Sequence, residues 1–167
     1  MPTATYEKIA TTTLGSAATS IDFTSIGSGY TDLRLILSAI GNFNGVGLRF
    51  NSDSGSNYSM TRLTGDGSTA GSYALANQTR INLGGFSVAS SATIPIFIDL
   101  NIFSYAGSTY KTWLDQLSFD KNGTGDTAAL VGLWRSTSAI TAINLTNMGG
   151  GNFNAGSTAT LYGILKA

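Results

Sequence analysis

Hydrophobic and polar residues alternate with a period of two along most of the chain. The longest stripe places Ile94, Ile96, Ile98, Leu100 and Ile102 on one side of an extended segment, as expected for a strand with one buried face. No window combines the spacing of an amphipathic helix with helix-forming residues and caps. The pattern predicts about ten short strands. They cover residues 6–14, 20–23, 30–40, 46–51, 58–62, 93–103, 112–119, 128–135, 140–145 and 158–165.

The segments between these stripes are rich in Gly, Asn and Ser, as in residues 41–45, 52–56 and 148–156. Gly and Asn tolerate the positive φ angles that tight turns require. Short strands joined by such turns favour an all-β fold, an antiparallel β-sandwich of jelly-roll-like architecture. No break in composition divides the chain, so we expect residues 1–167 to form a single domain, with 1–14 as an N-terminal arm or edge strand.

The amino-acid composition limits the kinds of catalytic, metal and partner-binding site that the chain can form. The 167 residues include no His and no Cys, which excludes a Ser-His-Asp triad, a thiolate nucleophile, a disulfide and a zinc site of the usual ligands. Nine basic and nine acidic residues give zero net charge, and the basic residues are scattered singly, which argues against a nucleic-acid partner. The chain has no apolar run of membrane-spanning length and no signal-like start. We therefore expect no membrane partner and synthesis in the cytoplasm.

Carboxylates and an ion-binding loop are the remaining routes to a chemical site. Glu7 is the only Glu, and most Asp residues fall in turns or at strand ends, where capping explains them better than a glycosidase pair does. The loop with Asn51 and Asp53 resembles a calcium loop, but Ser56 and Arg62 occupy the positions where an EF-hand needs Gly and Glu. We expect no enzyme, no cofactor and no metal; whether Asn51 and Asp53 hold an ion is left open.

Aromatic residues suggest two kinds of contact. Six of them could form a sugar-binding platform, although core packing is the better interpretation for those within strand stripes. The six are Tyr58, Tyr73, Tyr105, Tyr110, Trp113 and Trp134. Phe43 and Phe153 instead lie in Gly/Asn loops. Each is either an anchor for a protein partner or a ring folded back over the open end of the sandwich.

Three segments carry a resemblance that spans most of the chain. Residues 6–23 (YEKIATTTLGSAATSIDF), 48–58 (LRFNSDSGSNY) and 157–167 (STATLYGILKA) resemble small structural proteins of tailed bacteriophages, including phages of cyanobacteria. The resemblance implies one of two roles. A capsid decoration or cement protein is commonly a jelly roll whose trimers or dimers clamp neighbouring capsid subunits; the distal domain of a tail fibre or spike instead binds a host receptor or glycan.

The length of the chain favours the decoration protein, because a fibre tip normally follows a long shaft. We therefore expect a non-enzymatic virion protein on the capsid surface, with the major capsid protein and its own copies, in a homotrimer, as partners. We assign the capsid or subunit contact to Tyr6, Glu7 and Lys8 with the loop residues Phe43 and Phe153. A receptor-binding tail tip is the alternative.

Overall fold

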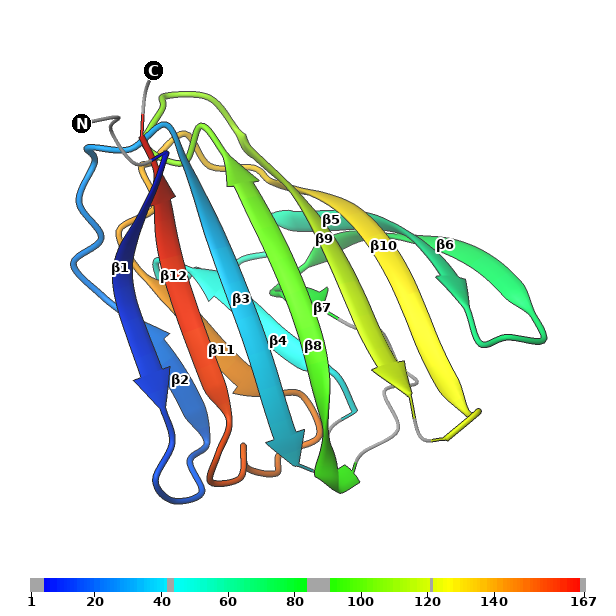
Figure 1. The fold of residues 1–167 in the computed structure, drawn as a ribbon. Helices are drawn as coiled ribbons and strands as arrows, with labels where there is room; N and C mark the ends of the chain where they lie inside the picture. Colours follow the sequence, from blue (N-terminus) through cyan, green and yellow to red (C-terminus); the bar gives the residue numbers. More distant parts are fainter. Residues whose placement is uncertain (1–4, 42–43, 84–90, 121, 166–167) are drawn as a thin grey trace.

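The computed structural model describes residues 5–41, 44–83, 91–120 and 122–165. This part of the chain forms twelve strands and no helix (Figure 1). All strand pairings are antiparallel and fall into two sheets. The prediction of an all-β antiparallel sandwich is confirmed.

The larger sheet has eight strands, with β1 and β6 at its edges. Across the sheet they are β1 (Tyr6–Thr13), β12 (Thr158–Ile164), β3 (Asp32–Gly41), β8 (Ser91–Phe103), β9 (Lys111–Asp120), β10 (Gly125–Trp134), β5 (Tyr58–Gly65) and β6 (Ala70–Gln78). The smaller sheet consists of β2 (Ser20–Phe23), β11 (Ile143–Asn147), β4 (Val46–Phe50) and β7 (Ile81–Leu83).

The strand order is that of a jelly roll with two additions. The orders β1-β12-β3-β8 and β2-β11-β4-β7 give two four-stranded sheets between which the chain repeatedly crosses, as in a double Greek key. The hairpin β5–β6 is inserted between β4 and β7, and the hairpin β9–β10 between β8 and β11. Strands β10 and β5 pair with each other, so the two hairpins together extend the larger sheet by four strands (Figure 1).

The core lies between the sheets and follows the period-two pattern. On β3, Leu33, Leu35 and Leu37 have no exposed surface, and Ile98 and Leu100 on the neighbouring β8 are equally buried. Burying a branched aliphatic side chain contributes roughly 1.5–3 kcal/mol. Phe50 and Trp113 meet edge to face in the core, with ring centroids 6.1 Å apart.

Three details differ from the sequence pattern. Strands β6 and β7 were not predicted: β6 alternates small residues with only Tyr73 and Leu75, and β7 has three residues, too few to show a period. Pro95 lies within β8, and a proline is typical of a sheet edge or a strand start, yet β8 is central. The ladder with β3 shifts register between Ala39 and Gly41, and the described pairing with β9 begins at Phe97. Pro95 therefore lies beside an irregularity, where a missing N–H is tolerated.

Candidate functional site

The N-terminal strand places Tyr6, Glu7 and Lys8 on the surface. The guanidinium carbon of Arg34, on β3, lies 5.7 Å from the centroid of the Tyr6 ring, within the range of a cation–π contact. Burial, then the charge and hydrogen bonding of Glu7, raises the pKa of Tyr30. The three residues therefore form an accessible group at one edge of the larger sheet, and Tyr6 and Glu7 also contact their neighbours.

The two loop phenylalanines do not join this group. Phe43 lies outside the described residues. Phe153 is fully buried, and its backbone exchanges hydrogen bonds of 2.8 and 2.9 Å with Ala18. It also forms a bridge with Gly41. Phe153 thus closes one end of the sandwich, the second of the two placements expected for it, and its ring offers no surface to a partner.

The loop after β4 is held together by its own hydrogen bonds. Asn51 Oδ1 accepts from the backbone N–H groups of Thr141 and Ala142 at 2.8 and 3.0 Å, and its Nδ2 donates to Ala139 O at 2.7 Å. Asp53 accepts from three donors: Trp134 Nε1 at 2.7 Å, Asn57 Nδ2 at 2.9 Å and Gly55 N at 2.8 Å. These contacts explain Asn51 and Asp53 as an Asx-rich hairpin.

The same contacts determine the charge of Asp53. Partial burial raises the pKa of this carboxyl, but the bonds from Trp134, Asn57 and Gly55 outweigh that effect, so the net shift is downward. Among the described residues, no three acidic side chains are grouped so that they could hold a metal ion. The loop therefore presents a carboxylate already occupied by protein donors.

Most of the six aromatic side chains that could form a sugar-binding platform are buried in the core. Tyr58, Tyr105, Trp113 and Trp134 are at most 2% exposed. The rings of Tyr58 and Trp134 are stacked with centroids 6.2 Å apart. Of the six, Tyr110 alone is strongly exposed, at 54%. A flat sugar face cannot reach the buried four, so the core interpretation holds for them.

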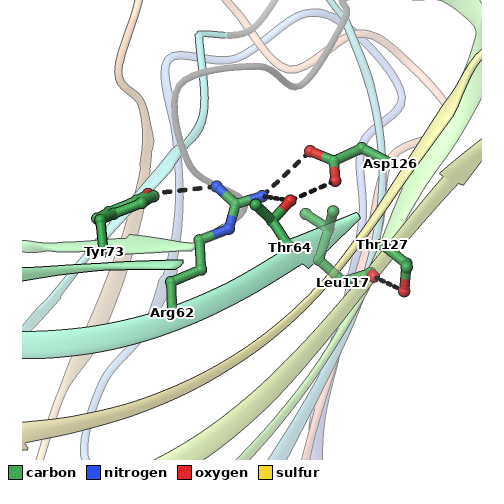
Figure 2. Close-up of polar contacts among 6 residues, drawn as sticks. All are labelled: Arg62, Thr64, Tyr73, Leu117, Asp126 and Thr127. Carbon is green, nitrogen blue, oxygen red and sulfur yellow. Dashed lines mark hydrogen bonds and ion pairs between the residues drawn. The ribbon is translucent and has the colours of Figure 1, made fainter. Parts of the chain in front are cut away.

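A polar cluster lies where the two inserted hairpins meet. Figure 2 shows the Arg62 guanidinium between Tyr73 on one side and Thr64 and Asp126 on the other. Arg62 donates to Tyr73 Oη at 3.3 Å, Thr64 Oγ1 at 3.3 Å and Asp126 Oδ2 at 3.1 Å, and Thr64 donates to Asp126 Oδ1 at 2.7 Å. The Arg62 side chain is only 2% exposed. These contacts fix β6, β5 and β10 relative to one another.

Asp115 is the unusual member of this region. It is fully buried on β9, and neither carboxyl oxygen has a hydrogen-bond partner among the described residues. Burial raises its pKa to about 8, although the nearby Arg62 and Trp113 act in the opposite direction. At neutral pH Asp115 is therefore mainly the uncharged acid, as expected for a carboxyl group kept from water.

The outward face of the added strands is apolar. Five large hydrophobic side chains point to solvent there: Leu63 (63% exposed), Val131 (52%), Phe97 (44%), Leu114 (43%) and Phe103 (42%). They come from β5, β10, β8 and β9, which are adjacent in the sheet. We call this set, with the small and hydroxylated residues between its members, the outer apolar face. Contiguous apolar surface of this kind marks interaction sites on soluble proteins.

Sequence reasoning did not single out the outer apolar face, although a signal for it exists. In the segment 112–119, Leu114 is apolar while the opposite parity already carries Trp113, Leu117 and Phe119. A strand with apolar residues on both faces either is covered on both or leaves one apolar face open. The structure shows that Leu114 belongs to the open face.

No family model, no curated protein and no solved structure matches the chain. Within the described residues, no helix is long and apolar enough to cross a membrane.

Proposed function

We propose that this chain is a structural protein of a bacteriophage virion, bound to the mature capsid in many copies and stabilising it as a homotrimer. The observation that carries the proposal is a jelly roll whose described carboxylates are engaged within the fold or isolated, while a broad apolar face stays open. Such a molecule is equipped for binding other proteins. The resemblance of residues 6–23, 48–58 and 157–167 to phage structural proteins supplies the setting.

The acidic residues support a non-enzymatic role. Asp53 is occupied by three donors, Asp126 is bound by Arg62 and Thr64, and Asp115 is buried away from solvent. Asp66 accepts hydrogen bonds from Ser68 and Thr69 within its own turn. A glycosidase instead needs two carboxyl groups facing a shared substrate across a cleft.

A decoration protein can stabilise the capsid simply by binding to its mature form. A protein that binds only the mature shell stabilises that shell by RT ln(1 + [L]/Kd) at each site, and the effect is multiplied over a symmetric capsid. In this proposal Tyr6, Glu7 and Lys8, exposed at the edge strand β1, contact the major capsid protein. Phe153 is removed from the contact set by its burial.

The location of the protein on the particle tests the role. Particles of the phage that encodes this chain are separated into heads and tails, and the protein is counted by quantitative mass spectrometry. We expect hundreds of copies on each head and none on tails. A few copies confined to the tail would reject the decoration role and support a receptor-binding tip.

The contact assignment has its own test. A triple substitution of Tyr6, Glu7 and Lys8 by Ser keeps the backbone ladder of β1 with β12 while removing the side chains. We expect the folded variant to lose at least tenfold in affinity for heads stripped of the native protein. The matched control replaces Thr11 and Thr13, exposed on the same strand, with Ser. Undiminished binding by the triple variant would remove the N-terminal strand from the contact.

A further inference from the structure

The two inserted hairpins are additions to a jelly roll that already has both of its four-stranded sheets. They extend the larger sheet from β8 to β6 and, with β8, carry the outer apolar face. In Figure 1 the extension continues the larger sheet well to the side of the first four strands, and β6 forms its far edge. We propose that the outer apolar face packs against the same face of a second copy of this chain about a two-fold axis, a contact that rests on and deepens the oligomeric part of the proposed function.

The chemistry of the face selects an uncharged partner. Apart from Asp120 at the end of β9, which accepts a hydrogen bond from Gly123 N, the outward positions of β9, β10, β5 and β6 carry no ionised side chain. They are Thr112, Leu114, Gln116 and Ser118; Thr127, Ala129, Val131 and Leu133; Ser59, Thr61, Leu63 and Gly65; and Ala70, Ser72, Ala74 and Ala76. On β8 the outward Asp99 is neutralised by Arg34. A nucleic acid or an anionic membrane finds no counter-charge here.

A second copy of this chain is a partner with the same properties. The chain has zero net charge, so two copies meet without long-range repulsion. An identical face offers the same apolar and hydroxylated groups, and interfaces between identical subunits are characteristically more apolar than the rest of the surface.

The shape of the outer apolar face, with depressions and projecting side chains, also suits packing against the same face of another copy. One depression is lined by Leu63, Phe97, Gln116 and Ala129, among others. A second lies towards β6 and is lined by Thr61, Ala74, Thr112 and Val131, among others. Large side chains project from β8 through β10, whereas small residues dominate β6. Projecting side chains of one copy therefore face hollows of matching chemistry on another.

The face is large enough to hold an oligomer. Strands lie about 4.8 Å apart and rise about 3.4 Å per residue. Five strands, from β8 to β6, and about eight residues along each therefore cover roughly 650 Å². Two such faces together bury about 1,300 Å², which lies within the range of stable protein interfaces.

The experiment measures mass in solution. Sedimentation equilibrium from about 1 to 100 µM should give at least twice the chain mass of 17.3 kDa for the wild type. Val131→Lys and Leu63→Lys each place a charge on the face and should weaken association at least tenfold. Ala17→Lys, in an exposed turn away from the larger sheet's face, is the matched control and should associate like the wild type.

Separate measurements report on the folding of each variant and on its function. Circular dichroism and the unfolding midpoint check that each variant is native, and the milder Val131→Thr replaces any Lys variant that is not. A wild type that stays monomeric to about 100 µM, or association unchanged in folded Val131→Lys and Leu63→Lys, overturns the inference. A monomer that still decorates heads would leave the proposed virion role standing; an oligomer that never binds heads would leave this surface standing.

Discussion

Two arginine–aspartate pairs on the larger sheet differ in the face they occupy. On the outer face, Arg34 grips Asp99 with two contacts, Nε to Oδ1 at 2.8 Å and Nη2 to Oδ2 at 2.5 Å, and the side chains are 33% and 20% exposed. On the inner face, Arg62 reaches Asp126 through one contact of 3.1 Å, with exposures of 2% and 9%. The outer pair has the better fork geometry, yet breaking the inner pair should cost more stability, because water cannot replace a lost partner there.

The comparison extends along one row of the inner face. Asp115 pairs in register with Leu100 on one side and Leu130 on the other, and Leu130 pairs in turn with Arg62. Towards β3 the row continues with Leu35. The jelly-roll half of the row is therefore aliphatic, whereas the half built by the inserted hairpins places ionisable groups at buried positions. The buried positions of this row therefore include ionisable side chains in the added half and only aliphatic side chains in the original half.

Removing the inner cation should give the largest effect. Arg62→Ala leaves Asp126 without its cation and removes the positive charge nearest Asp115, so we expect the free energy of unfolding to fall by about 3–5 kcal/mol. The matched outer variant, Arg34→Ala, should cost only about 0–1 kcal/mol. Urea unfolding of both variants at pH 7 measures the difference.

A double variant checks that charge is the cause. Arg62→Met combined with Asp126→Asn removes both ionised groups while keeping most of the volume. It should be more stable than Arg62→Ala, because no buried charge is left unpaired. Equal losses from Arg62→Ala and Arg34→Ala would show that the face of the sheet does not decide the strength of these pairs.

Two leucines, one on each face of the larger sheet, allow the same comparison of inner and outer positions with uncharged side chains. Leu100 has no exposed surface and Leu114 is 43% exposed. Leu100→Ala should cost about 3 kcal/mol, from lost burial and the cavity left behind. Leu114→Ala should change stability by less than about 1 kcal/mol when measured at dilution, where the chain is monomeric. Similar losses at both positions under those conditions would mean that Leu114 is covered within the monomer.

Much of this arrangement is encoded locally. Alternation along residues 30–40 and 93–103 predicts which side chains of β3 and β8 turn inward, and it holds residue by residue for Leu33, Leu35, Ile98 and Leu100. The same parity puts Arg62 with Tyr58 and Met60, and Asp115 with Trp113 and Leu117. An ionisable residue within a buried stripe is visible in the sequence as an exception to the pattern.

The rest depends on contacts between distant parts of the chain. Period-two stripes do not say that β1 pairs with β12 or that β10 pairs with β5, and those pairings decide that the two hairpins extend one sheet. The outer apolar face is therefore absent from any single segment. Phe153 illustrates the same limit, because its Gly/Asn loop left two placements open, and the backbone bridges to Ala18 and Gly41 decide that the residue is buried.

A further prediction is a dependence of stability on pH that arises from Asp115. Its folded pKa, about 8, lies above the usual value of 3.8 for an aspartate, so between those values the native state binds more protons than the unfolded chain. The contribution to stability is complete below about pH 4 and is lost as pH rises towards 8, at up to about 1.4 kcal/mol per pH unit. Asp115→Asn cannot titrate. It should therefore gain about 1–3 kcal/mol relative to the wild type between pH 5 and pH 7.

Asp66→Asn is the control for this titration. Asp66 lies in an exposed turn, where bonds from the backbone of Ser68 and Thr69 and from the Ser68 hydroxyl lower its pKa. Its proton is gained only in acid, so Asp66→Asn should leave the slope between pH 5 and pH 8 unchanged. Denaturant unfolding of the three proteins across this range measures the slopes. Parallel curves for Asp115→Asn and the wild type would show that the carboxyl group is ionised in the native state, and that the inserted half of the sheet holds two buried anions beside Arg62 instead of one.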